Sequence, residues 1–167
     1  LTPHKVRPAK NYIPWRWEQG TPNFECLSAI TAAVDYIASL GVGASRRERL
    51  LSAMTDVQTY EQALSARLLQ GLQRVPGVTV FGITDPRRLQ ERIPTFSFVV
   101  KGETPRMSCE RLARANVNSY NGNYYAVQVM ESLGLSENGA VRVGLAHYNT
   151  SEEIDRFLVA LAGETNQ

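Results

Sequence analysis

Arg142 is the residue whose type fits its surroundings least well. It lies in the run Val141-Arg142-Val143-Gly144-Leu145-Ala146, where apolar side chains alternate as in a strand buried on one side. Arg142 shares the other face with Gly144 and Ala146, which leave room around its guanidinium. A free guanidinium can bind a carboxylate or phosphate through two parallel hydrogen bonds. Arg142 is therefore a candidate anion-binding residue, and an exposed arginine on a solvated sheet face is the alternative.

A second candidate anion site lies near residue 20. Thr21 followed by Pro22 predicts the N-cap and first residue of a helix. Gly20 and the Thr21 hydroxyl, beside a helix N-terminus, could hold an anion, and a plain capping turn is the alternative. The apolar stripe expected on the buried face of this helix consists of Leu27, Ile30, Val34 and Ile37.

The segment after the Arg142 strand carries the signals of a helix start. Thr150 precedes Glu153 by three residues, which is the spacing of a capping box. Apolar residues then recur at helical spacing, at Ile154, Phe157, Leu158 and Leu161. This pattern predicts an amphipathic helix that closes the chain.

Both candidate sites resemble signatures of one enzyme family. The string Arg142-x-Gly-x-x-x-Tyr-Asn-Thr-x-Glu-Glu-Ile-Asp is similar to the C-terminal signature of class V aminotransferases and cysteine desulfurases. These are pyridoxal-phosphate (PLP) enzymes of fold type I. The run Trp17-Glu18-Gln19-Gly20-Thr21-Pro22-Asn23 resembles their Trp-Glu-x-Gly-Thr-Pro-Asn element. Since Leu1-x-Pro3-x-Lys5-Val6-Arg7-Pro8-Ala9 resembles the preceding segment of cysteine-desulfurase-like proteins, the likeness covers nearly the whole chain.

The resemblance implies an amino-acid substrate, a homodimer and PLP in the complete enzyme. Arg142 would clamp the substrate α-carboxylate, while Gly20 and Thr21 would contact the cofactor phosphate of the other subunit. Asn121 and Asn123 would belong to the substrate pocket, in the loop where desulfurases carry their nucleophilic cysteine; an Asn-Gly turn is the alternative. The identity of the amino acid stays open, as does the choice among transamination, desulfuration and elimination.

The lysines and cysteines do not match the family's catalytic residues. The chain has only three lysines, Lys5, Lys10 and Lys101, and none has the Ser/His-x-His-Lys context of the family's Schiff-base lysine. Cys26 and Cys109 lie outside the segment that corresponds to the desulfurase nucleophile, and both are expected to be small core residues. We therefore expect the C-terminal portion of a longer enzyme, inactive by itself.

The order of predicted elements indicates an α+β fold. Helices are expected at about 22–40, 46–74, 106–115, 124–133 and from 151, and strands at 78–81, 94–100, 117–120 and 141–146. A small, mainly antiparallel sheet would carry its helices on one face. Residues 1–44 would form an arm and helix that contact an absent large domain or a partner subunit, and residues 45–167 the C-terminal domain.

Composition excludes several classes of protein. A chain of 167 residues, 43% hydrophobic and 20% charged, is ordinary for one globular domain, and no apolar run reaches membrane-spanning length. Two cysteines without metal or disulfide spacing favour the cytoplasm. The net charge of +2 argues against a nucleic-acid partner, although basic and aromatic residues interleave in the N-terminal arm. A non-catalytic ligand-binding or structural domain is a further alternative.

Overall fold

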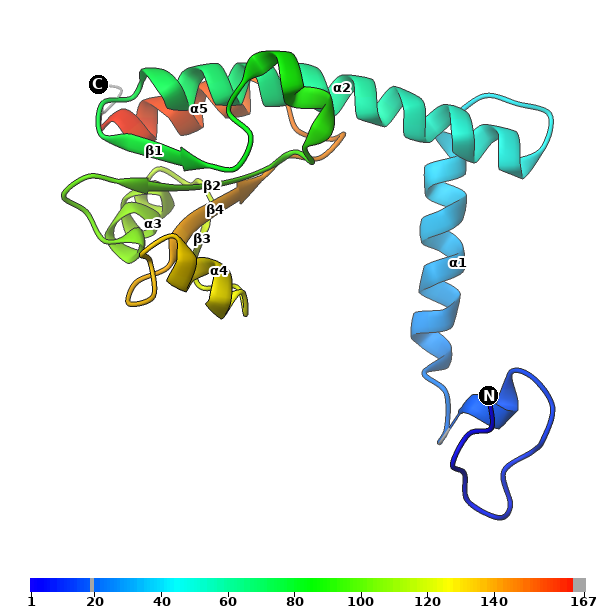
Figure 1. Ribbon diagram of the computed structural model, residues 1–167. Coiled ribbons are helices and arrows are strands. Elements are labelled where there is room, and N and C mark those ends of the chain that lie inside the picture. Colours follow the sequence, from blue (N-terminus) through cyan, green and yellow to red (C-terminus); the bar gives the residue numbers. More distant parts are fainter. Residues whose placement is uncertain (19, 164–167) are drawn as a thin grey trace. The chain divides into compact units, whose positions relative to one another are not determined.

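The computed structural model describes residues 1–18 and 20–163 (Figure 1). Its internal contacts divide the chain into two compact units, of which the first ends at Met54 and the second begins at Thr55. This division falls within the long helix α2 (Arg46–Arg74), whereas the boundary expected at residue 44 lies in the turn before that helix.

The N-terminal unit contains a 3-10 turn, η1 (Trp15–Trp17), helix α1 (Phe24–Ser39) and the beginning of α2. Asn23 caps α1, because its side-chain oxygen accepts a hydrogen bond from the backbone N–H of Cys26 at 2.9 Å. The predicted cap at Thr21 is therefore wrong. Asparagine is as good an N-cap as threonine and here directly precedes the first helical turn.

The apolar stripe of α1 is largely exposed. Leu27 and Ile30 have exposed fractions of 52% and 61%, and within α1 only Ala38 is buried. The prediction of a buried stripe is therefore wrong for this chain, and so is the predicted core role of Cys26, which is exposed. An amphipathic helix gains little from its apolar face unless another surface covers that face.

The C-terminal unit is built on a four-stranded antiparallel sheet with the order β1-β2-β4-β3. Its strands are β1 (Val78–Phe81), β2 (Thr95–Val100), β3 (Tyr120–Gly122) and β4 (Ala140–Gly144). The predicted α+β fold with a mainly antiparallel sheet is confirmed. Strand β4 ends two residues earlier than predicted, because the Asn149 side chain, not a strand, accepts the N–H of Ala146 at 2.8 Å.

One hydrophobic core lies over a single face of this sheet. Phe96 and Phe98 of β2 are fully buried there beside Val141 of β4. Helices α2, α3 (Pro105–Arg114) and α5 (Ser151–Ala162) all contribute side chains to this core, and α2 and α5 run side by side above the sheet (Figure 1). Their buried residues are Leu64, Leu68, Leu69, Leu72, Leu112, Ile154, Phe157 and Leu161.

The predicted closing helix is confirmed, including its capping box. The Thr150 hydroxyl accepts from the backbone N–H of Glu153 at 3.3 Å, and the Glu153 carboxylate accepts from the backbone N–H of Thr150 at 3.0 Å. Asn149 donates to the same carboxylate at 3.0 Å. The end of β4 is thus tied to the start of α5 by local hydrogen bonds.

The segment between α3 and β4 differs most from the prediction. Strand β3 begins at Tyr120 rather than at residue 117, and helix α4 (Val127–Ser132) begins three residues later than expected. Tyr124 and Tyr125 have φ angles of 55° and 60°, which cannot continue a right-handed helix. Between β1 and β2 lies a further short 3-10 helix, η2 (Pro86–Glu91).

Candidate functional site

Arg142 lies on the sheet face opposite the hydrophobic core. Its neighbours along β4, Val141 and Val143, pair with Phe98 and Phe96 on the core face. Ser97 of β2 and Tyr120 of β3 pair with Arg142 itself. Because side chains alternate along a strand, these three residues share the face that the core does not cover.

Two tyrosine rings hold the guanidinium of Arg142. Its Cζ atom lies 4.4 Å from the centre of the Tyr124 ring and 5.9 Å from that of Tyr120. The two rings are tilted against each other, with their centres 5.8 Å apart. Within residues 1–18 and 20–163, Arg142 makes no hydrogen bond or ion pair, so its N–H groups remain available for a ligand.

Tyr124 is itself fixed by the backbone of two strands. Its hydroxyl donates toward the carbonyl oxygens of Ala140 and, at 3.0 Å, of Tyr120. Burial raises the pKa of Tyr124 to about 12, although the Arg142 charge acts in the opposite direction. The phenol therefore stays protonated at neutral pH and continues to donate.

A hollow of about 560 Å³ opens around Arg142. The residues that line it belong to the start of β2 and the turn before it, to the start of β3 and the segment before it, and to β4. They are Ile93, Thr95, Asn118, Ser119, Tyr120, Arg142, Val143 and Gly144. Arg142 is the one charged residue among them. The Ser119 hydroxyl oxygen is buried without a hydrogen-bond partner in the described part of the chain. Such unsatisfied groups are rare and call for an explanation, a functional role among them.

The structure does not bring Asn121 and Asn123 to this hollow. Asn121 pairs with Val141, so its side chain belongs to the core face of β3. Asn123 is exposed, and its side-chain oxygen accepts from the backbone N–H of Tyr125 at 3.1 Å. From the same segment, Tyr120 and Tyr124 are the residues that reach Arg142.

The other predicted site residues, Gly20 and Thr21, lie in the N-terminal unit. They line a hollow of about 480 Å³ together with Glu18, Pro22, Asn23, Cys26 and Leu27. Since Asn23 caps α1, the Thr21 hydroxyl is not used there, and it makes no hydrogen bond within the described residues. One carboxylate oxygen of Glu18 is also buried without a partner there. Gln19, in the middle of the motif, lies outside the described residues.

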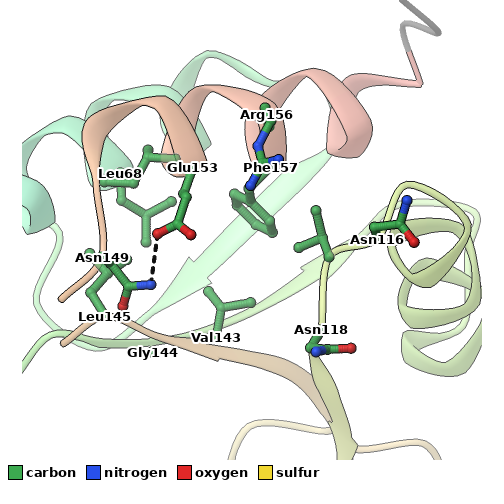
Figure 2. Close-up of a pocket in the computed structure, with 12 residues that line it drawn as sticks. Leu68, Asn116, Asn118, Val143, Gly144, Leu145, Asn149, Glu153, Arg156 and Phe157 are labelled. Carbon is green, nitrogen blue, oxygen red and sulfur yellow. Dashed lines mark hydrogen bonds between the residues drawn. The ribbon is translucent and has the colours of Figure 1, made fainter.

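A smaller hollow of about 260 Å³ lies between α5 and β4 in the C-terminal unit. Figure 2 shows Asn149 and Glu153 at one end of it and Asn116 and Asn118 at the other, with Val143 between them. The hydrogen bond from Asn149 and that from the Thr150 backbone lower the pKa of Glu153. Because Asn149 and Glu153 already take part in the capping of α5, these two side chains are not free for a ligand.

Within its own unit, no lysine lines a candidate site: Lys5 and Lys10 are absent from the Gly20–Thr21 hollow, and Lys101 is absent from the Arg142 hollow. Lys5 donates to the carbonyl oxygen of Ala9 at 2.6 Å, and Lys10 lies over the ring of Trp15 at 5.0 Å. Lys101 is exposed just beyond β2. Cys109 is half-buried and packs against the core, which agrees with its predicted role.

Two kinds of feature are absent from the described residues. They contain no group of three or more histidine, cysteine, aspartate or glutamate side chains placed to hold a metal ion. Among their helices, none combines the length and the apolar character that a membrane crossing needs.

These features define an α+β domain with an unpaired arginine on its open sheet face. The chain belongs to the aminotransferase class V family, because that family's sequence profile matches residues 5–157. The resemblance inferred from the two sequence motifs is thereby confirmed.

Individual relatives agree with this assignment. The chain is 38% identical, over 107 residues, to the aminotransferase-like protein FGM3 of Gibberella zeae. This match covers 63% of this chain and 26% of the relative. It is 30% identical, over 151 residues, to a probable cysteine desulfurase of Xylella fastidiosa, covering 90% of this chain and 32% of the relative.

Among solved structures, the apo cysteine desulfurase of Thermococcus onnurineus NA1 is similar, with a TM-score of 0.73 and 27% identity. That match covers 90% of this chain and 33% of the solved one. The chain thus spans about a quarter to a third of the length of these three proteins.

Proposed function

We propose that this chain is the C-terminal small domain of a longer, PLP-dependent enzyme that acts on an amino acid. The observation that carries the proposal is the unpaired guanidinium of Arg142 in an open hollow of the sheet face. The length of the relatives supports it further, because the chain matches only 26% and 32% of two of them. Under this proposal the chain alone has no catalytic activity.

In this enzyme Arg142 binds the α-carboxylate of the substrate. A guanidinium donates two parallel hydrogen bonds to a carboxylate, and such charge-assisted bonds are about twice as strong as neutral ones. No acidic side chain lines the hollow, so none of its lining residues competes with the substrate for the N–H groups of the Arg142 guanidinium. The remaining residues there are apolar or neutral, and they suit one carboxylate rather than two.

Gly20 and Thr21 offer contacts to one edge of a phosphate group, in a hollow that the Glu18 side chain also lines. A side chain at Gly20 would meet nothing within 4 Å, so a ligand can approach the backbone there. The free Thr21 hydroxyl can donate to a phosphate oxygen, and the N-terminus of α1 favours negative charge. When bound, PLP supplies an electron sink for reactions at the substrate's α-carbon. Gly20 and Thr21 would hold its phosphate in the neighbouring subunit of a homodimer.

The exposed apolar stripe of α1 supports the proposal that the N-terminal residues pack against another protein surface. Leu27 and Ile30 are more than half exposed, and the unpaired Glu18 oxygen lacks a donor in the described residues. If residues 1–44 packed on the larger domain or on the second subunit, the apolar stripe would be buried and the Glu18 oxygen could accept a hydrogen bond. Burying an unpaired polar group without a partner is costly.

The positions of the cysteines and lysines support a proposal in which sulfur transfer and the covalent attachment of PLP take place on groups outside this chain. Cys26 and Cys109 lie outside the Arg142 hollow, and none of the three lysines lines either candidate site. We therefore assign these roles to the part of the enzyme that precedes this chain. Free cysteines without a disulfide framework are in keeping with the cytoplasm.

The test is the kinetics of Arg142→Ala and Arg142→Lys in the longer protein. Loss of the carboxylate contact should cost about 2–4 kcal/mol in kcat/KM, a factor of tens to about a thousand, while PLP stays bound. Arg142→Lys should restore only part of the activity, because a point charge cannot reproduce the fork. As a control, Arg114→Ala removes an exposed arginine of α3 that lines neither hollow, and it should change kcat/KM by less than about twofold.

A decarboxylated analogue of the substrate decides between binding of the carboxylate and a general role. The analogue lacks the group that Arg142 contacts, so its turnover should be nearly unchanged by Arg142→Ala. Equal losses with the amino acid and the analogue would show that Arg142 is no carboxylate clamp. A longer protein without PLP absorbance would instead favour a non-catalytic ligand-binding domain.

A further inference from the structure

The partners of Arg142 differ from those of most other arginines in the C-terminal unit. Arg67, Arg87, Arg88, Arg106 and Arg111 each form an ion pair with a carboxylate. Arg142 instead lies over the rings of Tyr124 and Tyr120, and it has no ion pair within the described residues. The structure thus holds this cation without occupying its hydrogen-bond donors.

We infer that Tyr124, assisted by Tyr120, is a positioning residue that holds the Arg142 guanidinium with its N–H groups free for a carboxylate. The inference rests on the proposed function, in which Arg142 binds the substrate. Neither tyrosine needs to touch the substrate for this role. Tyr124 is suited to this role because its ring contacts Arg142, its hydroxyl is fixed by the backbone, and no acidic side chain lines the hollow.

An aromatic ring is suited to this task for an electrostatic reason. The face of the ring carries partial negative charge and attracts a cation, but it accepts no conventional hydrogen bond from the guanidinium edge. A carboxylate partner would hold Arg142 more strongly, yet it would occupy the same fork that the substrate needs. The ring contact also restricts the long arginine side chain before binding, which lowers the entropic cost of ordering it.

Tyr124 can act as a fixed support because its own position is strongly determined. Its hydroxyl reaches carbonyl oxygens on β3 and β4, the two strands that flank the contact. Its backbone is in the left-handed region, with a φ of 55°, which turns the chain back from β3 toward α4. Tyr120 is anchored differently, since it pairs directly with Arg142 in the β3–β4 ladder.

The experiment compares Tyr124→Phe, Tyr124→Leu and Tyr120→Leu in the longer protein with its PLP. The quantity measured is the preference for the amino acid over its decarboxylated analogue in kcat/KM. Tyr124→Leu removes the ring and should reduce this preference by about 2- to 30-fold, mainly through KM of the amino acid. Tyr124→Phe keeps the ring and should keep most of the preference, and Tyr120→Leu should cause a smaller loss because that ring is farther away.

Tyr60 supplies the matched control. Its hydroxyl also donates to a backbone carbonyl, that of Asn149 at 2.7 Å, but neither ring contact of Arg142 involves it. Tyr60→Phe and Tyr60→Leu should therefore leave the preference unchanged. If Tyr124→Phe and Tyr124→Leu reduce it equally, or if both substrates lose turnover in parallel, Tyr124 has only a structural role and the inference is wrong.

Nuclear magnetic resonance of this chain alone tests the contact without catalysis. The ring current of Tyr124 should shift the Arg142 Nε–H signal, and Tyr124→Leu should move it toward the position of an unstacked arginine, while Tyr60→Leu should not. An unshifted signal in the unsubstituted chain would overturn the inference even if Arg142→Ala still abolished the substrate preference. If the signal is shifted but Arg142→Ala leaves the preference intact, it is the proposed function that fails, and the positioning role falls with it.

Discussion

Among the described residues, Tyr124 has a pKa that departs strongly from its ordinary value. Its pKa is raised to about 12 from an ordinary value of 10.0, chiefly because burial disfavours the phenolate. The folded state therefore keeps a proton that the unfolded state releases. The stabilising contribution of this group is fully present below pH 10 and is lost as the pH rises through 12.

We predict that Tyr124→Phe makes the free energy of unfolding less sensitive to pH between 10 and 12. The substitution removes the Tyr124 hydroxyl, whose proton the folded state retains, while the ring remains in place. Denaturant unfolding of both proteins across this range measures the difference, and phenolate absorbance should show one fewer late-titrating tyrosine in the variant. Parallel stability curves for the two proteins would contradict the prediction.

Strands β3 and β4 meet through a close approach of two glycines, Gly122 and Gly139. Gly139 has a φ of 69°, and a side chain there would overlap the backbone of Gly122. Gly134 has a similar φ of 70°, but a side chain there would meet nothing within 4 Å. A comparison of Gly139 with Gly134 therefore separates the cost of a backbone clash from the cost of the left-handed conformation.

We predict that Gly139→Ala lowers the free energy of unfolding by more than about 3 kcal/mol and that Gly134→Ala lowers it by about 1–2 kcal/mol. Gly139→Ala should also weaken the contact of Arg142 with Tyr120, because β3 must move away from β4. Urea denaturation of both variants tests the first statement. Equal losses would mean that the backbone at Gly139 adapts and that its conformation alone sets the cost.

The start of α5 depends on the capping box that follows β4. Thr150→Ala removes the acceptor of the Glu153 N–H and should cost about 0.5–2 kcal/mol of stability. Thr150→Ser keeps an acceptor oxygen and should recover most of this loss. Thermal or urea unfolding gives the comparison, and a Thr150→Ser variant as unstable as Thr150→Ala would show that the methyl group matters more than the cap.

For the molecule as a whole, the proposed function places the lysine that binds PLP outside this chain. Lys5 and Lys10 are held by contacts within the N-terminal arm, and Lys101 is exposed beyond β2. We expect the isolated chain to form no PLP adduct that borohydride can trap and to turn over no amino acid. Mass spectrometry after reduction is the measurement, and a PLP-modified peptide at Lys5, Lys10 or Lys101 would refute the expectation.

Local signals in the sequence were sufficient for several elements of this fold. Helix α2 covers Arg46–Arg74 and strand β1 covers Val78–Phe81, both as predicted, and α5 carries the predicted capping box. Helical periodicity, glycine and proline stops and caps act within a few residues of each other. The alternation around Arg142 is also a local signal. In any strand, neighbouring side chains such as Val141 and Arg142 point to opposite faces.

The sequence by itself determined that Arg142 lies on the polar face of a strand, but only the tertiary structure decided what it touches. The register of β3 against β4 puts Tyr120 beside it, and the left-handed backbone at Tyr124 brings the second ring underneath. The same register turns Asn121 toward the core face and away from the candidate site. Strand pairing depends on packing between segments distant in the chain, and a shift of one residue exchanges the two faces, so no local pattern could have selected Tyr120 over Asn121.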